Sequence, residues 1–155
     1  GEPFVGRSGK VLDHLLENVG LDPLQDIYIC NAVKCRPPKN RRPSKSEVLA
    51  SLPWLKQQIE LVDPWVIVLA GSTAVETLLG LKDKISTLRG VWHCWDGRMV
   101  MPLFHPSYLL RNPSRVEGSP IALTCGDFKD VKNKLKEFQE AISMPMLDCN
   151  RGCKS

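Results

Sequence analysis

One uninterrupted apolar run constrains the fold of this 155-residue chain more than any other feature. The run, Trp65-Val66-Ile67-Val68-Leu69-Ala70, ends at Gly71. A strand with one face in water alternates apolar and polar residues, whereas a strand covered on both faces is apolar throughout. The run therefore predicts an interior strand of a parallel sheet, with helices on both faces of that sheet.

Predicted helices and strands alternate on either side of this run. Apolar spacing, cap residues and glycine stops indicate helices over 9–19, 44–61, 72–79 and 126–141, with a short helical turn from Pro106. Ser44 or Ser46 is expected to cap the second helix, and Ser72 the third. Further strands are predicted over 26–33, 91–95 and 98–103, the last two joined by an Asp96-Gly97 turn.

This order of elements predicts an α/β fold. A chain of 155 residues suits one domain with one sizeable core. We expect a three-layer α/β/α domain with a central, mostly parallel sheet over residues 1–143. Residues 144–155 are expected to form a flexible C-terminal tail.

The distribution of charge is more informative than the net charge of +4. Six basic residues and no acidic one lie between positions 34 and 45: Lys34, Arg36, Lys39, Arg41, Arg42 and Lys45. Prolines at 37, 38 and 43 exclude a helix, so we expect an extended basic loop. Such a loop is either a solvated surface loop or localisation patch, or it follows a phosphate backbone.

Three features are expected at the carboxyl ends of the strands, where α/β sheets bind ligands. Gly71-Ser72 is either an ordinary turn and cap or a phosphate site at a helix N-terminus. Asn31 lies in an apolar segment, where a buried amide needs partners and has both a donor and an acceptor to offer a planar ligand. His105 is either a structural residue or an electrostatic or acid–base group.

The six cysteines, at 30, 35, 94, 125, 149 and 153, are scattered through a chain large enough to fold without disulfides. The spacing of the last two is wider than that of a CxxC metal or redox pair. We expect reduced thiols throughout.

Three segments resemble motifs of the iron–sulfur (family 4) uracil-DNA glycosylases. Residues 1–9, GEPFVGRSG, are similar to the family segment GxPFVGRAG. Residues 28–41, YICNAVKCRPPKNR, are similar to YITNVVKCRPPxNR. Residues 105–113, HPSYLLRNP, are similar to HPSYLLRxP. The match follows the family's order from residue 1 to about 135, and Leu88-Arg89-Gly90 also has an equivalent there. The resemblance implies a uracil-DNA glycosylase-like fold and release of uracil from DNA.

The resemblance also implies roles for residues that would touch the flipped base. Phe4 would stack on uracil, and Asn31 would pair with its O4 and N3–H, a pattern that cytosine reverses. His105 would stabilise the negative charge that develops near uracil O2 during cleavage.

Further residues are implied at the DNA. Ser107 would bind a phosphate next to the lesion. Leu109, with Leu110 as the neighbouring candidate, would fill the space left by the base. Arg111 and the basic loop would add nonspecific phosphate contacts.

Two departures from the resembling family bear on activity. An acidic segment that positions water in that family has no counterpart here, and Glu2 is not assigned its role. A [4Fe-4S] cluster is implied by resemblance, but only Cys35 matches one of its four cysteine ligands, and Ser51 stands at the fourth. We therefore expect no cluster in this chain.

Two hypotheses remain. The protein is either a uracil-DNA glycosylase of base excision repair, or a catalytically impaired nucleic-acid-binding domain that keeps the uracil pocket. An unrelated nucleotide binder using Gly71-Ser72 does not explain residues 105–113. The expected partner is uracil-containing DNA, bound by a monomer.

No apolar run approaches the ~20 residues that cross a bilayer, so neither a transmembrane segment nor a membrane partner is expected. The start at Gly1 rather than Met predicts that upstream sequence has been removed. We expect a soluble intracellular protein in a DNA-containing compartment, an organelle included.

Overall fold

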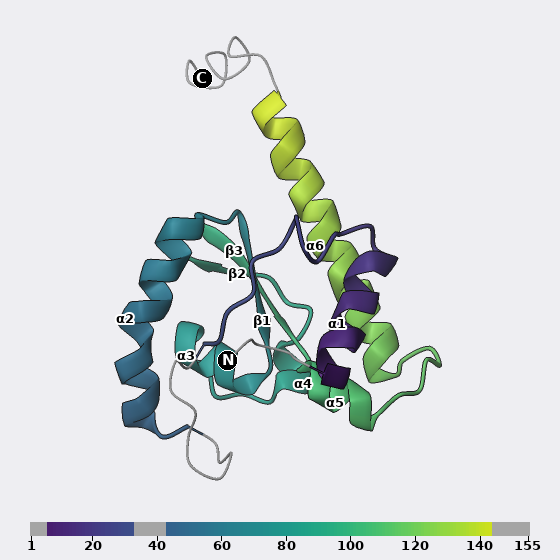
Figure 1. Ribbon diagram of the computed structural model, residues 1–155, viewed down its shortest axis with the longest axis horizontal. Helices are drawn as coiled ribbons and strands as arrows, with labels where there is room; N and C mark the ends of the chain where they lie inside the picture. The colour runs from purple at the N-terminus through teal and green to yellow at the C-terminus, as the bar shows by residue number, and fades with distance from the viewer. Residues whose placement is uncertain (1–5, 33–42, 144–155) are drawn as a thin grey trace.

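A computed structural model describes residues 6–32 and 43–143 (Figure 1). The helices are α1 Gly6–Asn18, α2 Lys45–Val62, α3 Ser72–Leu79, α4 Ile85–Leu88, α5 Pro106–Arg111 and α6 Pro120–Ser143, and the strands are β1 Val66–Ala70, β2 His93–Trp95 and β3 Arg98–Leu103. Several predictions fall on residues outside the described ranges: Phe4, Lys34, Cys35, Arg36, Lys39, Arg41, Arg42 and the tail over 144–155.

The described sheet has three strands in the order β1-β3-β2. β1 pairs with β3 in parallel, from Val66 opposite Met99 to Ala70 opposite Leu103. β2 pairs with β3 antiparallel, and Asp96 and Gly97 join them with positive φ angles of 48° and 73°, as a tight hairpin turn requires. The α/β class is confirmed, with one parallel and one antiparallel pairing in the described part of the sheet.

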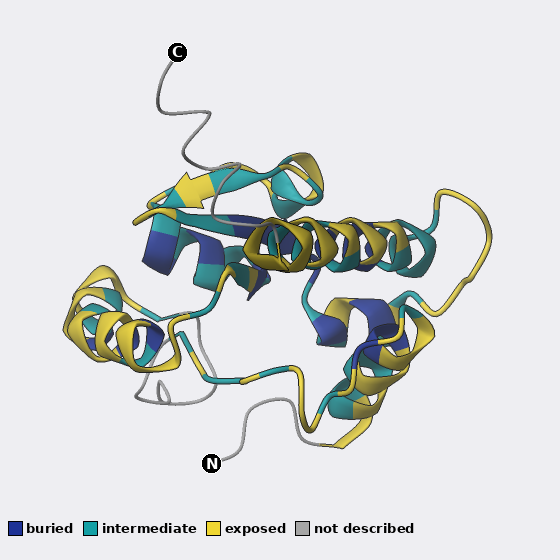
Figure 2. Cartoon of the chain, turned by 90° about the horizontal axis from the view of Figure 1, so that it is seen from above, coloured by how far each residue is buried: buried dark blue, intermediate teal, exposed yellow. Residues whose placement is uncertain are grey.

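Helices cover both faces of this sheet, so the three-layer arrangement is confirmed. On β3, Val100 belongs to a core cluster with residues of α2 and α3, whereas Met101 and Leu103 belong to a second cluster with residues of α1, α5 and α6. This alternation follows from the two-residue period of a strand. Figure 2 shows the outer faces of the helices exposed and buried positions turned inward.

The apolar run lies at β1, but this strand is at the edge of the described sheet rather than in its interior. Ile67 and Leu69 pack in one core cluster and Val66 in the other, which accounts for an apolar residue at successive positions. Val68 is 36% exposed. An uninterrupted apolar run therefore indicates that both faces of a strand pack against other residues. It does not indicate whether the strand has one neighbouring strand or two.

The strand predicted over 26–33 is not formed in its described part, residues 26–32. Ile27, Cys30 and Ala32 pack against the two core clusters, so their apolar character is explained by packing. Tyr28 is exposed. Apolar patterning can therefore hold a segment against the core without a strand partner.

Helix boundaries follow local cap chemistry. Ser44 caps α2 and forms a reciprocal capping box with Glu47, which decides between the two predicted caps. Ser72 is not the cap of α3: Gly71 occupies that position, with no side-chain cap bond. α6 begins at Pro120, earlier than predicted, because proline is favoured in the first turn of a helix.

Candidate functional site

His105 lies where β3 passes into α5. It is the N-cap of α5, with φ −67° and ψ 139°, and its Nδ1 accepts a hydrogen bond from the backbone N–H of Ser107 at 3.1 Å. The Ser107 hydroxyl oxygen lies 2.7 Å from the same nitrogen. Both contacts orient the imidazole ring from one side.

These contacts determine which nitrogen of His105 carries the proton. A backbone N–H can only donate, so Nδ1 must be the unprotonated nitrogen and Nε2 carries the hydrogen. Burial lowers the pKa of His105 below its usual value, and the positive charge of Arg111 lowers this pKa further. His105 is thus held as a neutral ring with an N–H donor at Nε2.

Gly71 lies beside His105 at the end of the neighbouring parallel strand. Its N–H donates to the carbonyl of Leu103 at 2.9 Å, which continues the β1–β3 pairing by one bond. That N–H is therefore engaged within the sheet. This favours the turn reading of Gly71-Ser72 over a phosphate site that would use the same group.

Asn31 is exposed in the described structure, whereas a buried amide was expected. The difference arises because residues 26–32 form no strand. Its neighbours Cys30 and Ala32 pack against the core cluster that includes Leu69 and Val75. This anchors the Asn31 segment against β1 and α3, and His105 also contacts the start of α3 through Gly71.

The α5 residues after Ser107 divide between core and surface. Leu109 is 1% exposed and belongs to the core cluster with Leu15, Met101 and Phe128. Leu109 would therefore have to leave this core cluster to fill the space of a flipped base, and that role stays a prediction. Leu110 is half-buried and Arg111 is exposed, so both reach the surface.

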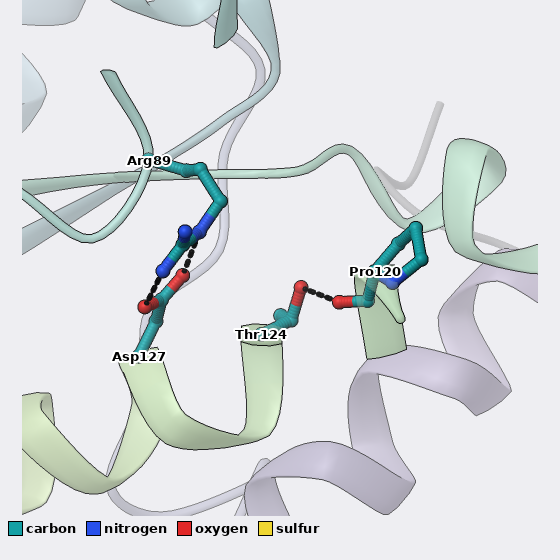
Figure 3. Close-up of polar contacts among 4 residues, drawn as sticks. All are labelled: Arg89, Pro120, Thr124 and Asp127. Carbon is teal, nitrogen blue, oxygen red and sulfur yellow. Dashed lines mark hydrogen bonds and ion pairs between the residues drawn. The ribbon is translucent and has the colours of Figure 1, made fainter. Parts of the chain in front are cut away.

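A buried ion pair behind β3 was missed by sequence reasoning (Figure 3). Arg89, between α4 and β2, binds Asp127 of α6, and the Asp127 side chain is 4% exposed. The hydrogen bonds to Asp127, and then the negative charge of that carboxylate, raise the pKa of Arg89. The match of Leu88-Arg89-Gly90 to a family segment was a signal for this site, but nothing in the sequence identified Asp127 as the partner.

The described residues do not fit the iron–sulfur cluster implied by resemblance. Ser51 is 3% exposed within α2, at the position of the fourth ligand, and a hydroxyl is a poor ligand for iron in such clusters. Over 6–32 and 43–143, no three His, Cys, Asp or Glu side chains are grouped as metal ligands. The cysteines in these ranges, Cys30, Cys94 and Cys125, are free thiols.

The helices in the described ranges include none with the length and apolar character needed to span a bilayer.

Fold and site together define an α/β domain with a neutral histidine donor at the carboxyl end of its parallel strands. Residues 1–136 match the family described as the uracil DNA glycosylase superfamily, and the chain belongs to that family.

Similar proteins carry related names. A type-4 uracil-DNA glycosylase of Thermotoga maritima is 49% identical over 116 residues, covering 74% of this chain and 60% of the relative. A type-4 uracil-DNA glycosylase of Saccharolobus solfataricus is 36% identical over 144 residues, covering 87% of this chain and 64% of the relative. A DNA polymerase of Bacillus phage SP01 is 33% identical over 160 residues, covering 88% of this chain and 17% of the phage protein. The chain thus spans less than two thirds of the length of these relatives.

Proposed function

We propose that the protein is a uracil-DNA glycosylase that acts on DNA in base excision repair. The observation that carries this proposal is the neutral His105, held as an Nε2–H donor in a chain of the uracil DNA glycosylase superfamily. The partner is uracil-containing DNA, and one chain suffices because one flipped base occupies one pocket.

The reaction breaks the bond between C1′ of the deoxyribose and N1 of uracil. The bonding electrons leave with the base, and their negative charge spreads over the ring oxygens. The oxygen of water bonds to C1′, the proton that this water releases neutralises the uracil anion, and an abasic site remains. A preorganised donor aimed at the developing charge lowers the barrier, and Nε2–H of His105 is such a donor for uracil O2.

A neutral donor suits this step. His105 needs no proton from solvent before reaction, and its ring is already fixed by Ser107. Because Nδ1 accepts from Ser107, the ring cannot flip to the other tautomer without losing that bond. The arrangement therefore favours charge stabilisation over general acid catalysis by an imidazolium.

Asn31 is the proposed determinant of base choice. Its amide N–H would donate to uracil O4 and its carbonyl would accept from N3–H, whereas cytosine offers the reverse pattern. A site built to hydrogen-bond one pattern can reject the other by about 10⁴-fold, since mismatched buried groups lose their partners. Asn31 is exposed in the described structure, so this discrimination requires that the bound base exclude water from the amide.

The remaining contacts proposed for DNA follow the resemblance. Phe4 would stack on the base, Ser107 would contact a neighbouring phosphate, and Leu109 or its more exposed neighbour Leu110 would fill the space left by the base. Nonspecific phosphate contacts would come from the basic residues Lys34, Arg36, Lys39, Arg41, Arg42 and Arg111. We assign no residue to positioning the attacking water, and no step passes through an iron–sulfur cluster.

The test is release of free uracil from a single-stranded oligonucleotide with one uracil, which removes the energy of opening a duplex. His105→Ala should lower the rate by about 10²–10³-fold, as expected for loss of one charge-stabilising donor. His14→Ala, at an exposed position of α1, is the matched control and should leave the rate unchanged. Equal rates for all three proteins would refute the role of His105.

A further inference from the structure

We propose that Gly71 is a positioning residue for His105: its missing side chain leaves the space that the imidazole ring occupies. The inference rests on the proposed function, because it deepens the account of the same site. It concerns how the Nε2 donor is aimed.

The contact between the two residues is close. A Cβ added at Gly71 would lie 3.1 Å from Cβ of His105, 3.2 Å from its Cδ2 and 3.5 Å from its Cγ. The first two distances are shorter than ordinary van der Waals contact, so the ring would have to move by a few tenths of an ångström. Cδ2 is bonded to Nε2, and a displacement of this edge therefore displaces the donor itself.

Sheet pairing brings Gly71 to this place. Ala70 is opposite Leu103 in the parallel β1–β3 pair, and the Gly71 N–H donates to the Leu103 carbonyl. Both strands end there, and His105 follows two residues after β3. The close approach is thus a consequence of register rather than of a mobile loop.

The ring has a neighbour on two sides. Ser107 binds Nδ1, and the Cγ–Cδ2 edge faces the place where a side chain at residue 71 would begin. Of the two ring nitrogens, Nε2 is the one not turned toward Ser107. A methyl group at residue 71 would press on the ring while Ser107 holds Nδ1, so the ring must tilt or lose that hydrogen bond.

The backbone conformation at position 71 is a second reason for glycine there, independent of the contact with His105. Gly71 has a φ of +92°, which an L side chain rarely adopts, so any substitution there is strained. Gly80 controls for a positive φ alone, because its ψ of 11° places it in the left-handed helical region, whereas Gly71, with a ψ of 166°, has a conformation found almost only in glycine. Gly80 ends the same helix, α3, at a φ of +72°, and an added Cβ would have nothing within 4 Å.

The experiment compares Gly71→Ala and Gly80→Ala with the unaltered protein. Long-range ¹H–¹⁵N spectra of the histidine rings report the tautomer and the Nδ1 hydrogen bond, and the His105→Ala spectrum identifies the His105 signals. We expect Gly71→Ala alone to shift the His105 nitrogen signals. Unchanged His105 signals in Gly71→Ala, or equal shifts in Gly80→Ala, would overturn the proposal.

Steady-state uracil release gives the second readout. Gly71→Ala should lower kcat roughly tenfold with KM within about twofold, because the donor is misaimed while DNA binding is intact. Gly80→Ala should leave both constants near those of the unaltered protein. A change confined to KM would contradict the positioning role. If the unaltered protein releases no uracil, the proposed function fails, and the spectra still decide the positioning claim.

Stability measurements cover the case in which Gly71→Ala folds poorly. The shift in urea midpoint caused by Gly71→Ala is measured in the unaltered protein and in the His105→Ala background. Removing the ring relieves the contacts at Cδ2 and Cγ, so the shift should be smaller in that background. The contact with Cβ of His105 remains in both backgrounds, so equal shifts would mean that the imidazole ring adds nothing to the cost at residue 71, and the proposal would fail.

Discussion

The Arg89 guanidinium donates two hydrogen bonds to the Asp127 carboxylate, from Nε at 2.9 Å and from Nη2 at 2.7 Å. Gly90, the next residue, donates its N–H to the carbonyl of Pro102 in β3 at 3.0 Å. A Cβ at Gly90 would lie 2.7 Å from Oδ1 of Asp127. The pair therefore fastens α6 to the back of the strand that leads to His105.

Removing Arg89 should destabilise the whole domain. Arg89→Ala would leave the buried Asp127 carboxylate without its charge partner, which costs about 3 kcal/mol of unfolding free energy in comparable pairs. Urea denaturation measures this loss. Glu137→Gln is the matched control, because Glu137 forms an exposed pair with Lys134 and its loss should cost less than about 0.5 kcal/mol. Similar losses for the two variants would show that the buried pair has no special role.

The rate of uracil release should fall at acid pH as His105 becomes protonated. Burial, and then the charge of Arg111, lower the pKa of His105 below its usual value of 6.5, so the midpoint of the acid limb should lie below pH 6.5. Protonation places a hydrogen on Nδ1, opposite the Ser107 N–H that donates to it. A pH profile of kcat/KM reports this group in the free protein, to which the pKa shift applies.

Arg111→Gln tests the electrostatic part of this shift. Without the Arg111 charge, the pKa of His105 should rise and the acid limb should move to higher pH. A limb that moves to lower pH would contradict the assignment.

The same pKa shift affects stability. As the pH falls, the unfolded chain takes up a proton on His105 near pH 6.5, whereas the folded protein does so only at a lower pH. The contribution of His105 to the free energy of unfolding is therefore present above pH 6.5 and is lost as the pH falls through the folded pKa.

Substitutions of Leu109 and Leu110 should have different effects, the first mainly on stability and the second mainly on uracil release. Leu109→Ala should cost about 2–5 kcal/mol of unfolding free energy, because it empties a position that is 1% exposed. Leu110→Ala should cost less, and should slow uracil release from duplex DNA more than from single strands, since only a duplex needs the vacated space filled. Equal effects of Leu110→Ala on both substrates would exclude its proposed role.

Iron content tests the consequence of Ser51. The purified protein should contain far less than one iron–sulfur cluster per chain, and anaerobic reconstitution with iron and sulfide should not produce the visible absorption of a bound cluster. Ser51 lies buried in α2, where a hydroxyl replaces a thiolate. A stoichiometric cluster would contradict this prediction and would require ligands other than the residue at 51.

Local chemistry made much of the fold predictable. Asp96-Gly97 specifies a turn and Gly80 a helix end from a few neighbouring residues, and both are found in the structure. The cap of α2 was predicted as Ser44 or Ser46, and the structure decides for Ser44. The failed strand over 26–32 had the right composition, but a strand also needs a partner at a suitable edge. Sequence patterns do not report that long-range condition.

The site was predictable in its members more than in its geometry. His105 and Ser107 were singled out, but their mutual hydrogen bonds depend on how α5 begins. The burial of Leu109 depends on packing between α1 and α5, and the contact of Gly71 with His105 depends on strand register. Each of these contacts either joins segments that are distant in the sequence or depends on how a side chain is oriented. A short sequence motif specifies neither the distant neighbour nor the orientation.

The most direct test of the central claim is base release from matched oligonucleotides that carry a single uracil, cytosine or thymine, with Asn31→Ala assayed beside the unaltered protein. The account predicts release of uracil alone, and loss of that release in Asn31→Ala while the variant stays folded. A folded protein that binds the uracil oligonucleotide without releasing the base, or one that releases all three bases alike, would contradict it.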